Sequence, residues 1–314
     1  MNPVVVTAGE SMIRLMGAEA TRLRHADSLT VGIAGAESNL AIGLSRLGHA
    51  VALITRLGDD ELGELVLRRI AAERVDLRGV RRVHGASTGL LLREQAPEGQ
   101  RVYYYRHGSA ASGLSPDDVD PTLLAGARVL HLTGITPSLS ASARAFCDAL
   151  MVEARGQGLM VSLDVNFRSR LWPAEACRGW IEAALPAADL LFISREEGEA
   201  LWGAVDQALL ERLAAAGPRG VILKGDGADS LAWVEGQLHR APLHAVSAVD
   251  PVGAGDAFAA GYLDGWLAGR PPEACLRQAN AMGAICVTGR GDYEGLPERA
   301  SLERFMAGSH ELGR

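Results

Sequence analysis

A polar, glycine-rich turn near residue 250 is the segment of this sequence best suited to do chemistry. It reads Asp250-Pro251-Val252-Gly253-Ala254-Gly255-Asp256 and leads into an apolar run, Ala257–Leu267, that predicts a helix. The first backbone N–H groups of a helix have no intrahelical partner, and small residues leave room for an anion to reach them. The N–H groups of Gly253, Ala254 and Gly255 therefore predict a phosphate-binding site.

Asp256 lies in the first turn of the same predicted helix. A carboxylate beside a bound phosphate is a poor anion binder, but it is suited to take the proton from an attacking hydroxyl group. An ordinary helix start, in which the helix dipole favours an acidic residue, remains open on this motif alone. Two other phosphate loops are absent, since no G-x-x-x-x-G-K-[ST] occurs and Phe258 interrupts a G-x-G-x-x-G pattern. A dinucleotide site is thus poorly supported.

A second small-residue turn opens a predicted helix at Gly35. Glycine at this position would let a sugar lie against the backbone, while Glu37 and Asn39 offer hydrogen-bond acceptors and a donor. A plain capped helix start is the alternative that this segment alone favours.

An aromatic segment near residue 104 offers a different kind of contact. In an alternating strand, Tyr104 and Arg106 share one face. A ring beside a guanidinium suits a polar ligand with a carboxylate. An aromatic ladder that stabilises a small sheet is equally compatible with the spacing.

Polar side chains also follow two predicted strands. Asn166 and Arg168 come after the apolar run Met160–Asp164, at the sheet edge where open α/β sheets bind ligands. Arg168 is suited to hold a carboxylate or a transferring phosphoryl group, and a loop with internal Asp–Arg pairing is the alternative. Lys224, Gly225 and Gly227 follow a further strand and predict either a nucleotide contact or a simple turn.

Two more segments complete the set of candidates. Ser194 follows a predicted strand, and Glu197 is a candidate to position Mg²⁺ through water. A capping box between these two residues is the better-supported interpretation. Near the end of the chain, a glycine-rich loop places Asp292 where it is able to reach a sugar hydroxyl, or where it belongs to a surface turn.

Short apolar runs predict the elements that position these residues. Runs of this kind suit strands buried on both faces of a parallel sheet, and helical patterns lie between them. The predicted strands are Val4–Ala8, Val51–Thr55, Val129–Thr133, Met160–Asp164, Leu190–Ile193 and Val221–Leu223. The predicted helices include one through Leu40, Leu44 and Leu47 that Gly48 stops, and Ala141–Arg155, Pro173–Leu185 and Asp206–Ala216. This alternation predicts a doubly wound α/β domain spanning residues 1–314.

Two segments break the alternation. Residues 10–31 and 84–108 contain no clear helix and hold short alternating runs joined by the turn-like Ala96-Pro97-Glu98-Gly99. We predict that they form a small antiparallel sheet inserted into the main fold, in a position suited to a lid.

Composition excludes several classes of function. The 314 residues are 48% hydrophobic and carry a formal charge of −7, which argues against disorder and against nucleic acid as a main partner. No apolar run is long enough to predict a membrane span, and Met1–Met16 lacks the order of a signal peptide. Cys147, Cys177, Cys275 and Cys286 are far apart, and the eight histidines form no metal-ligand pattern. We expect a cytoplasmic protein.

Taken together, these segments resemble the ribokinase-like (PfkB) carbohydrate kinases over nearly the whole chain. The motifs that carry the resemblance are Gly35-Ala36-Glu37-Ser38-Asn39 and the turn from Asp250 to Asp256. Within the family, the chain is similar to the branch that phosphorylates 2-keto-3-deoxygluconate. That similarity rests on Tyr104-Tyr105-Arg106, Gly108-Ser109-Ala110, His131-Leu132-Thr133-Gly134-Ile135, Asp164-Val165-Asn166-Phe167-Arg168 and Gly291-Asp292 with Glu294-Gly295.

The resemblance implies phosphoryl transfer from ATP to the terminal hydroxyl of a sugar acid, giving a 6-phosphate. It implies a ribokinase-like fold, Asp256 as the base, Mg²⁺ bridging the ATP phosphates and a homo-oligomer formed through the lid. The anion hole would consist of Gly253, Ala254 and Gly255. The implied substrate contacts are Gly35, Asn39, Tyr104, Arg106, Arg168 and Asp292, and the implied nucleotide contacts are Asn166, Ser194, Lys224, Gly225, Gly227 and Asn280. A monovalent cation such as K⁺ near Asp250 is left open.

Some residues depart from the family pattern. Leu91 lies in the lid strand where many sugar-acid kinases of this type have a tyrosine, and Ser194 replaces a frequent asparagine. Two arginines, Arg106 and Arg168, are more than a neutral hexose needs and suit an acid. The alternatives are a kinase for 2-keto-3-deoxygalactonate, fructose or 5-keto-2-deoxygluconate, and a non-catalytic sugar-binding regulator.

Overall fold

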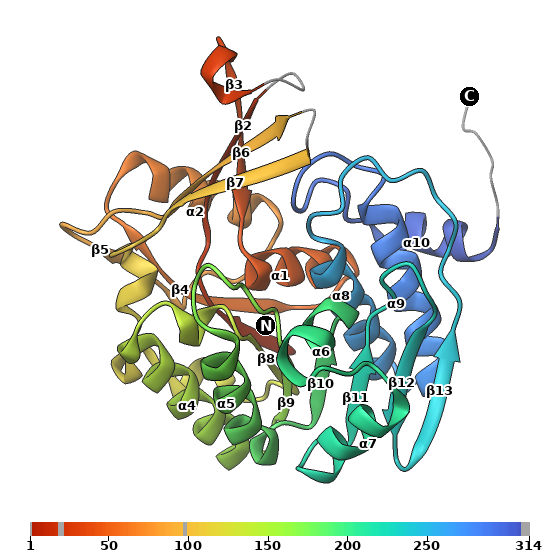
Figure 1. Cartoon of the computed structure of the whole chain (residues 1–314). Helices are drawn as coiled ribbons and strands as arrows, with labels where there is room; N and C mark the ends of the chain where they lie inside the picture. The colour runs from red at the N-terminus through yellow and green to blue at the C-terminus, as the bar shows by residue number, and fades with distance from the viewer. Residues whose placement is uncertain (1, 18–21, 97–98, 309–314) are drawn as a thin grey trace.

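A computed structural model describes residues 2–17, 22–96 and 99–308. Helices flank a large sheet, and a separate small sheet extends from it (Figure 1). The strands are β1 Val5–Ala8, β2 Met12–Gly17, β3 Leu29–Ala34, β4 Val51–Gly58, β5 Val80–Val83, β6 Leu90–Ala96, β7 Gly99–Tyr105, β8 Val129–Thr133, β9 Met160–Asp164, β10 Leu190–Ile193, β11 Gly220–Leu223, β12 Ser230–Val234 and β13 Gln237–Ala241. The α-helices are α1 Ala36–Arg46, α2 Glu61–Ala72, α3 Pro121–Leu124, α4 Ala141–Gly156, α5 Ala174–Ala184, α6 Arg195–Trp202, α7 Gln207–Ala215, α8 Ala254–Leu267, α9 Pro272–Cys286 and α10 Arg299–Met306.

The large sheet has the strand order β13-β12-β11-β10-β9-β8-β1-β4-β5. Its strands from β11 to β5 are parallel, and β12 and β13 continue it antiparallel at one edge. All six predicted strands are present, and β8, β9 and β10 have the predicted ends. Because these strands are parallel, their carboxyl ends meet at one edge of the sheet, where the polar residues that follow them are brought together.

Helices cover both faces of the large sheet. Val5 packs in an apolar cluster with buried residues of α1, α8 and α9, whereas its neighbour Val6 belongs to a cluster with α4, α5 and α7. Successive residues of a strand point to opposite faces, so each strand contributes to both cores. This arrangement confirms the predicted doubly wound α/β architecture.

The helices that the sequence predicts begin and end close to the expected positions. Leu47 caps α1, and Gly48 follows it with φ of 91°, a conformation that glycine adopts without strain. The helices α4, α5 and α7 each differ from prediction by one residue or less at either end. The helix α8 begins at Ala254, so the glycine-rich turn leads directly into its first turn.

The small sheet has the order β3-β2-β6-β7 and stands above the body of the molecule (Figure 1). Both predicted insertions contribute to it, but the prediction of a wholly antiparallel sheet is wrong. The two hairpins are antiparallel within themselves, and the central pair β2–β6 is parallel. Each hairpin comes from a different insertion, so the central strands are not joined by a turn that would force them to run in opposite directions. We call this small sheet the lid.

The connections around the lid define how it is inserted. The chain leaves the large sheet after β1 and returns with α1, then leaves again after β5 and returns after β7. The first insertion also contains a 3-10 turn at Leu23–His25. Residues 18–21 of this insertion, and Pro97 and Glu98 of the predicted turn, lie outside the described residues. We propose on this connectivity that residues 1–314 form one domain with a lid.

No helix of the described chain has the length and apolarity to cross a bilayer.

Candidate active site

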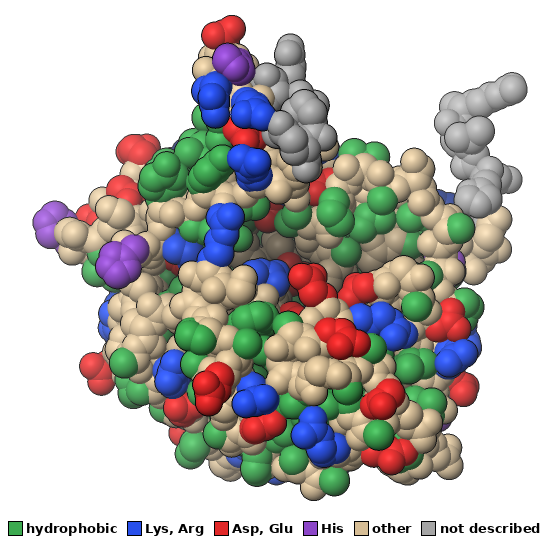
Figure 2. Space-filling view, viewed as in Figure 1, with side chains coloured by type: hydrophobic (Ala, Val, Ile, Leu, Met, Phe, Trp, Pro, Cys, Tyr) green, Lys and Arg blue, Asp and Glu red, His purple; other side chains and the backbone are tan. Residues whose placement is uncertain are grey.

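The predicted site residues converge beneath the lid, at the carboxyl ends of the central strands. Figure 2 shows the surface hollowed at this point, with acidic and basic side chains around the hollow. The cavity has a volume of about 400 Å³. Fourteen predicted residues line it, namely Gly35, Asn39, Tyr104, Arg106, Asn166, Arg168, Ser194, Glu197, Lys224, Gly253, Ala254, Gly255, Asp256 and Asp292.

The glycine-rich turn presents backbone N–H groups to this cavity. Gly253 is the N-cap of α8 with φ of 80°, and a Cβ at this position would lie 2.0 Å from the carbonyl oxygen of Asp292. Among the described residues, the N–H groups of Gly253 and Gly255 have no acceptor, and that of Ala254 makes only a long 3.4 Å bond to Pro251. Unpaired donors at a helix N-terminus are suited to hold an anion.

The carboxyl group of Asp256 lies in the first turn of α8 and faces the cavity. Its Oδ2 accepts a hydrogen bond of 2.8 Å from Asn39 Nδ2, and its Oδ1 lies 3.5 Å from Asn166 Nδ2. Desolvation and the nearby charge of Asp164 raise the pKa of Asp256 to about 7, although the Asn39 hydrogen bond, Lys224 and Arg168 act in the opposite direction. A carboxyl group with this pKa is matched to a general base near neutral pH.

A buried ion pair supports the floor of the cavity. Lys224 Nζ donates to both carboxylate oxygens of Asp164, at 2.7 and 2.6 Å. Burial lowers the pKa of Lys224, but attraction to Asp164, Glu197 and Asp256 outweighs it, so the pKa is raised and the ammonium stays charged. Asp164 therefore pairs with Lys224 rather than with Arg168, which corrects the alternative of an internal Asp–Arg loop.

The lid contributes an aromatic ring and an arginine to the opposite wall. The Arg106 guanidinium lies over the ring of Tyr104, with its central carbon 5.6 Å from the ring centroid. Arg106 is 7% exposed and forms an ion pair with Glu10, which itself is 1% exposed. Arg168 is exposed and donates to the carbonyl of Phe167, and it forms no ion pair among the described residues, although its charge acts on Asp256. The charge of Arg106 is thus balanced within the protein, whereas that of Arg168 is not.

Asp292 lines the cavity, but its carboxylate already has partners. Its Oδ1 accepts from Arg14 at 3.0 Å and from Arg93 at 3.2 Å. Neither arginine was singled out from the sequence, because their acidic partners lie between 157 and 280 residues away and no local pattern marks them. Glu37 also differs from expectation, since it is buried beneath the site and accepts from Thr133 and Thr136.

Glu197 and Ser194 form the capping box that the sequence favours. The Ser194 hydroxyl accepts from the N–H of Glu197, and Glu197 Oε2 accepts from that of Ser194. Glu197 Oε1 accepts from the N–H of Phe167 at 2.8 Å. Within the described ranges, no group of three or more His, Cys, Asp or Glu side chains is placed to hold a metal.

A second, smaller cavity of about 170 Å³ continues from the first on the side of α9. The two cavities share Lys224, Asp226, Ala254 and Gly255, so they form one groove. Most of its other lining residues are apolar or small, and the predicted residues Gly225 and Asn280 belong to it. Asn280 Nδ2 donates to Ser230 and to the carbonyls of Ala241 and Pro242, so it also fixes the loop that forms one wall. Gly227 lines neither cavity and adopts a turn with φ of 72°.

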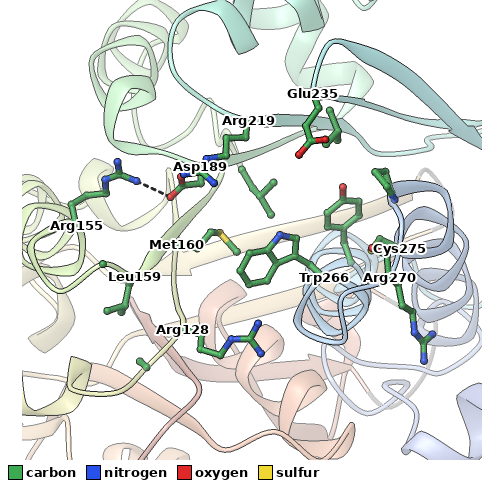
Figure 3. Close-up of a pocket in the computed structure, with 16 residues that line it drawn as sticks. Arg128, Arg155, Leu159, Met160, Asp189, Arg219, Glu235, Trp266, Arg270 and Cys275 are labelled. Atoms are coloured by element: carbon green, nitrogen blue, oxygen red, sulfur yellow. Dashed lines mark hydrogen bonds and ion pairs between the residues drawn. The ribbon is translucent and has the colours of Figure 1, made fainter.

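A larger cavity of about 610 Å³ lies at the amino ends of β9 and β10, on the other edge of the sheet. Figure 3 shows Asp189 joined to Arg155 by an ion pair, with Trp266 among the other lining side chains. Its arginines have partners in the protein, because Arg219 also approaches Asp189 and Arg128 lies over Trp266. None of the predicted site residues line this cavity, so its size does not make it the active site.

The sequence as a whole matches a family model described as pfkB family carbohydrate kinase over residues 2–299. The chain belongs to this family. It is 37% identical over 309 residues to the 2-dehydro-3-deoxygluconokinase of Bacillus subtilis (strain 168), covering 96% of this chain and 95% of that protein. It is 33% identical to the 2-dehydro-3-deoxygalactonokinase of Haloferax volcanii, covering 93% of each. The crystal structure of 2-dehydro-3-deoxygluconokinase from Thermotoga maritima is similar, with a TM-score of 0.88 and 27% identity over 97% of this chain and 99% of that one.

Family membership confirms the ribokinase-like fold and the class of carbohydrate kinase expected from the sequence. The match over residues 2–299 agrees with motifs that resemble the family along nearly the whole chain.

Proposed function

We propose that the protein transfers the γ-phosphoryl group of ATP to the 6-hydroxyl of 2-keto-3-deoxygluconate, with Asp256 as the general base. The observation that carries this proposal is the position of Asp256. Asp256 lines the same cavity as Gly253 and Gly255, whose N–H groups have no acceptor among the described residues, and its carboxyl group has a pKa near neutrality. The relatives named above act on 2-keto sugar acids, the class of substrate whose carboxylate suits Arg168.

The proposed reaction needs positioning and charge stabilisation more than covalent chemistry. The substrate hydroxyl oxygen attacks the γ-phosphorus, Asp256 accepts the hydroxyl proton, and the bond to the bridging oxygen breaks so that ADP leaves with the electron pair. Asn39 and Asn166 orient the Asp256 carboxylate. The N–H groups of Gly253, Ala254 and Gly255 face the charge that develops on the phosphoryl oxygens.

The groove that joins the two cavities fits ATP. The smaller cavity, with Leu243, Phe258 and Val287 among its lining residues, suits a nucleobase, and Lys224 lies between it and the anion hole. Mg²⁺, when bound, neutralises the phosphates. We assign Glu197, a carboxylate in the cavity wall, to the water shell of the bound Mg²⁺. The four buried free cysteines are compatible with a cytoplasmic enzyme.

The test is ADP release with Mg-ATP on a panel of 2-keto-3-deoxygluconate, its galacto epimer, 5-keto-2-deoxygluconate, fructose and ribose. We expect the highest kcat/KM on the first compound. Preference for the galacto epimer would correct the substrate and keep the class, because the Haloferax relative carries that name. Turnover of a neutral sugar alone would overturn the assignment of Arg168. ATP binding with no turnover on any compound would favour a non-catalytic regulator.

The pKa of Asp256 predicts a pH profile that depends on Asn39. A base must be deprotonated to act, so kcat/KM should rise with pH to a plateau above about 7 in the wild-type enzyme. The hydrogen bond from Asn39 stabilises the charged carboxylate, so Asn39→Ala should move the acidic limb to higher pH by about 0.5–1 unit. A profile measured between pH 5 and 9 checks the shift, and an acidic limb that stays in place would contradict the role of Asn39.

We also propose that the lid mediates self-association. Its outer strands expose Leu29, Val31, Tyr103 and Tyr105, an apolar and aromatic face on an otherwise polar surface. Sedimentation at micromolar concentration should show a dimer. Val31→Asp, together with Tyr105→Asp, should give a monomer, whereas a wild-type monomer would contradict the proposal.

A further inference from the structure

Asp250 lies at the start of the anion-hole turn and is 3% exposed. Its Oδ1 accepts from the N–H of Val252 at 3.2 Å, and its Oδ2 accepts from that of Gly291 at 3.0 Å. The same Oδ2 accepts from the guanidinium of Arg93, which reaches it from β6 in the lid. The carboxylate of Asp250 therefore joins the anion-hole turn, the glycine-rich loop at Gly291 and the lid.

The contacts of Asp250 do not fit a bound monovalent cation such as K⁺. A monovalent ion at this carboxylate would have to share it with a guanidinium that is itself only 2% exposed. The neighbouring acids are occupied in the same way, because Arg14 of β2 donates to Asp292 at 3.0 Å and to Glu294 at 2.6 Å. A buried carboxylate needs one compensating charge, and here an arginine provides it.

We propose that Arg93 is a built-in cation of the anion hole, which orders the glycine-rich turn in place of a monovalent metal ion. Arg93 acts through Asp250 and is a positioning residue, since the described structure gives it no place in the cavity wall. Arg14 supports it through Asp292, whose Oδ1 accepts from both arginines. The carbonyl of Asp292 in turn lies directly against Gly253. This inference rests on the kinase activity proposed above.

A glycine at position 32 leaves the space that the Arg14 guanidinium occupies. A Cβ at Gly32 would lie 2.0 Å from Arg14 Nη2, so any larger residue would displace that guanidinium. Because both arginines belong to lid strands, the geometry also couples the lid to the anion-hole turn. The phosphate-binding N–H groups depend on charges that the lid supplies.

The test compares K⁺ with tetramethylammonium, a cation too large for a site that fits K⁺, at equal ionic strength of about 0.1 M. In the wild-type protein, kcat should differ by less than about twofold between the two salts, and the melting temperature should show no K⁺-specific shift. In Arg93→Met, kcat should fall by about tenfold or more in tetramethylammonium and recover in part with K⁺, with KM for the sugar little changed. Arg24→Met, at an exposed arginine of the 3-10 turn in the first insertion, is the charge-matched control.

The melting readout needs no substrate, so it separates this inference from the proposed function. A K⁺ activation of about tenfold in the wild-type enzyme, or a K⁺-specific rise in its melting temperature, would overturn the inference. Full activity of Arg93→Met would do the same. If Arg93→Met fails to fold, Arg93→Lys keeps a positive charge beside Asp250 and should remain insensitive to K⁺, and a K⁺ response in that variant would overturn it too.

Discussion

Asp256→Asn is expected to lower kcat by at least about 10², while ATP and the sugar acid still bind. The substitution keeps the shape of the side chain and the contact with Asn39, but the amide is not able to accept the proton of the attacking hydroxyl. Stopped-flow or coupled assays of ADP release give kcat, and calorimetry gives the two affinities. Near-full activity in this variant would end the assignment of Asp256 as the base.

The same substitution should stabilise the protein. The pKa of Asp256 is about 7 in the folded chain and 3.8 for the ordinary side chain, so the folded state binds more protons between these two values. Stability therefore falls as pH rises from about 4 to 7, and it stays lower above that range. Three pKa units correspond to about 4 kcal/mol at most, and contact with solvent in the open cavity reduces the expected gain to about 1–2 kcal/mol.

Thermal unfolding at pH 8 measures this gain, with an expected rise of about 2–4 °C in the melting temperature. The exposed acid Asp117 gives a matched control, because Asp117→Asn removes the same charge from the surface. We expect no change in that variant beyond about 0.5 kcal/mol. A lower melting temperature for Asp256→Asn would contradict the raised pKa of Asp256. It would mean that the charge of this carboxylate does not destabilise the fold.

The central strands of the fold were predictable because each is buried on both faces and reads as a continuous apolar run. Val129–Thr133 is an example, with every residue buried. The helix α9 was not predicted, because it is buried around most of its circumference and includes the polar residues Gln278 and Asn280 in that burial. No single apolar stripe marks such a helix. The pair β12–β13 is short and half-exposed, which leaves a similarly weak pattern.

The site residues divide along a similar line. The sequence was sufficient to place Asp256, Lys224 and Arg168. Each of them follows a strand or opens a helix, so the local pattern predicts its position at the sheet edge. Glu10, Arg14 and Arg93 act through partners that are distant in the chain, such as the pair of Arg14 and Asp292. Only the folded chain brings these charges together, and this is why the partner of Arg106 was not anticipated.

Because Arg106 is already paired with Glu10, Arg168 is the arginine that we expect to bind the substrate carboxylate. We expect Arg168→Gln to raise KM for 2-keto-3-deoxygluconate by about 10–100-fold, because a charge-assisted contact with the substrate carboxylate is lost. KM for a neutral sugar such as fructose, where it is turned over at all, should change by less than about threefold. Arg212→Gln, at an exposed arginine of α7 outside the cavity, is the matched control for a change in surface charge.

Arg106→Met should behave differently from Arg168→Gln, although both remove one positive charge from the cavity. It leaves Glu10 buried without a cation, which typically costs about 3–5 kcal/mol, so the melting temperature should fall and both kinds of sugar should be used less well. Arg168 is exposed and forms no ion pair among the described residues, so its removal should not destabilise the chain. Parallel KM measurements on an acid and a neutral sugar, with melting curves for each variant, distinguish the two arginines. Equal effects of Arg168→Gln on both sugars would mean that the substrate carboxylate is held elsewhere.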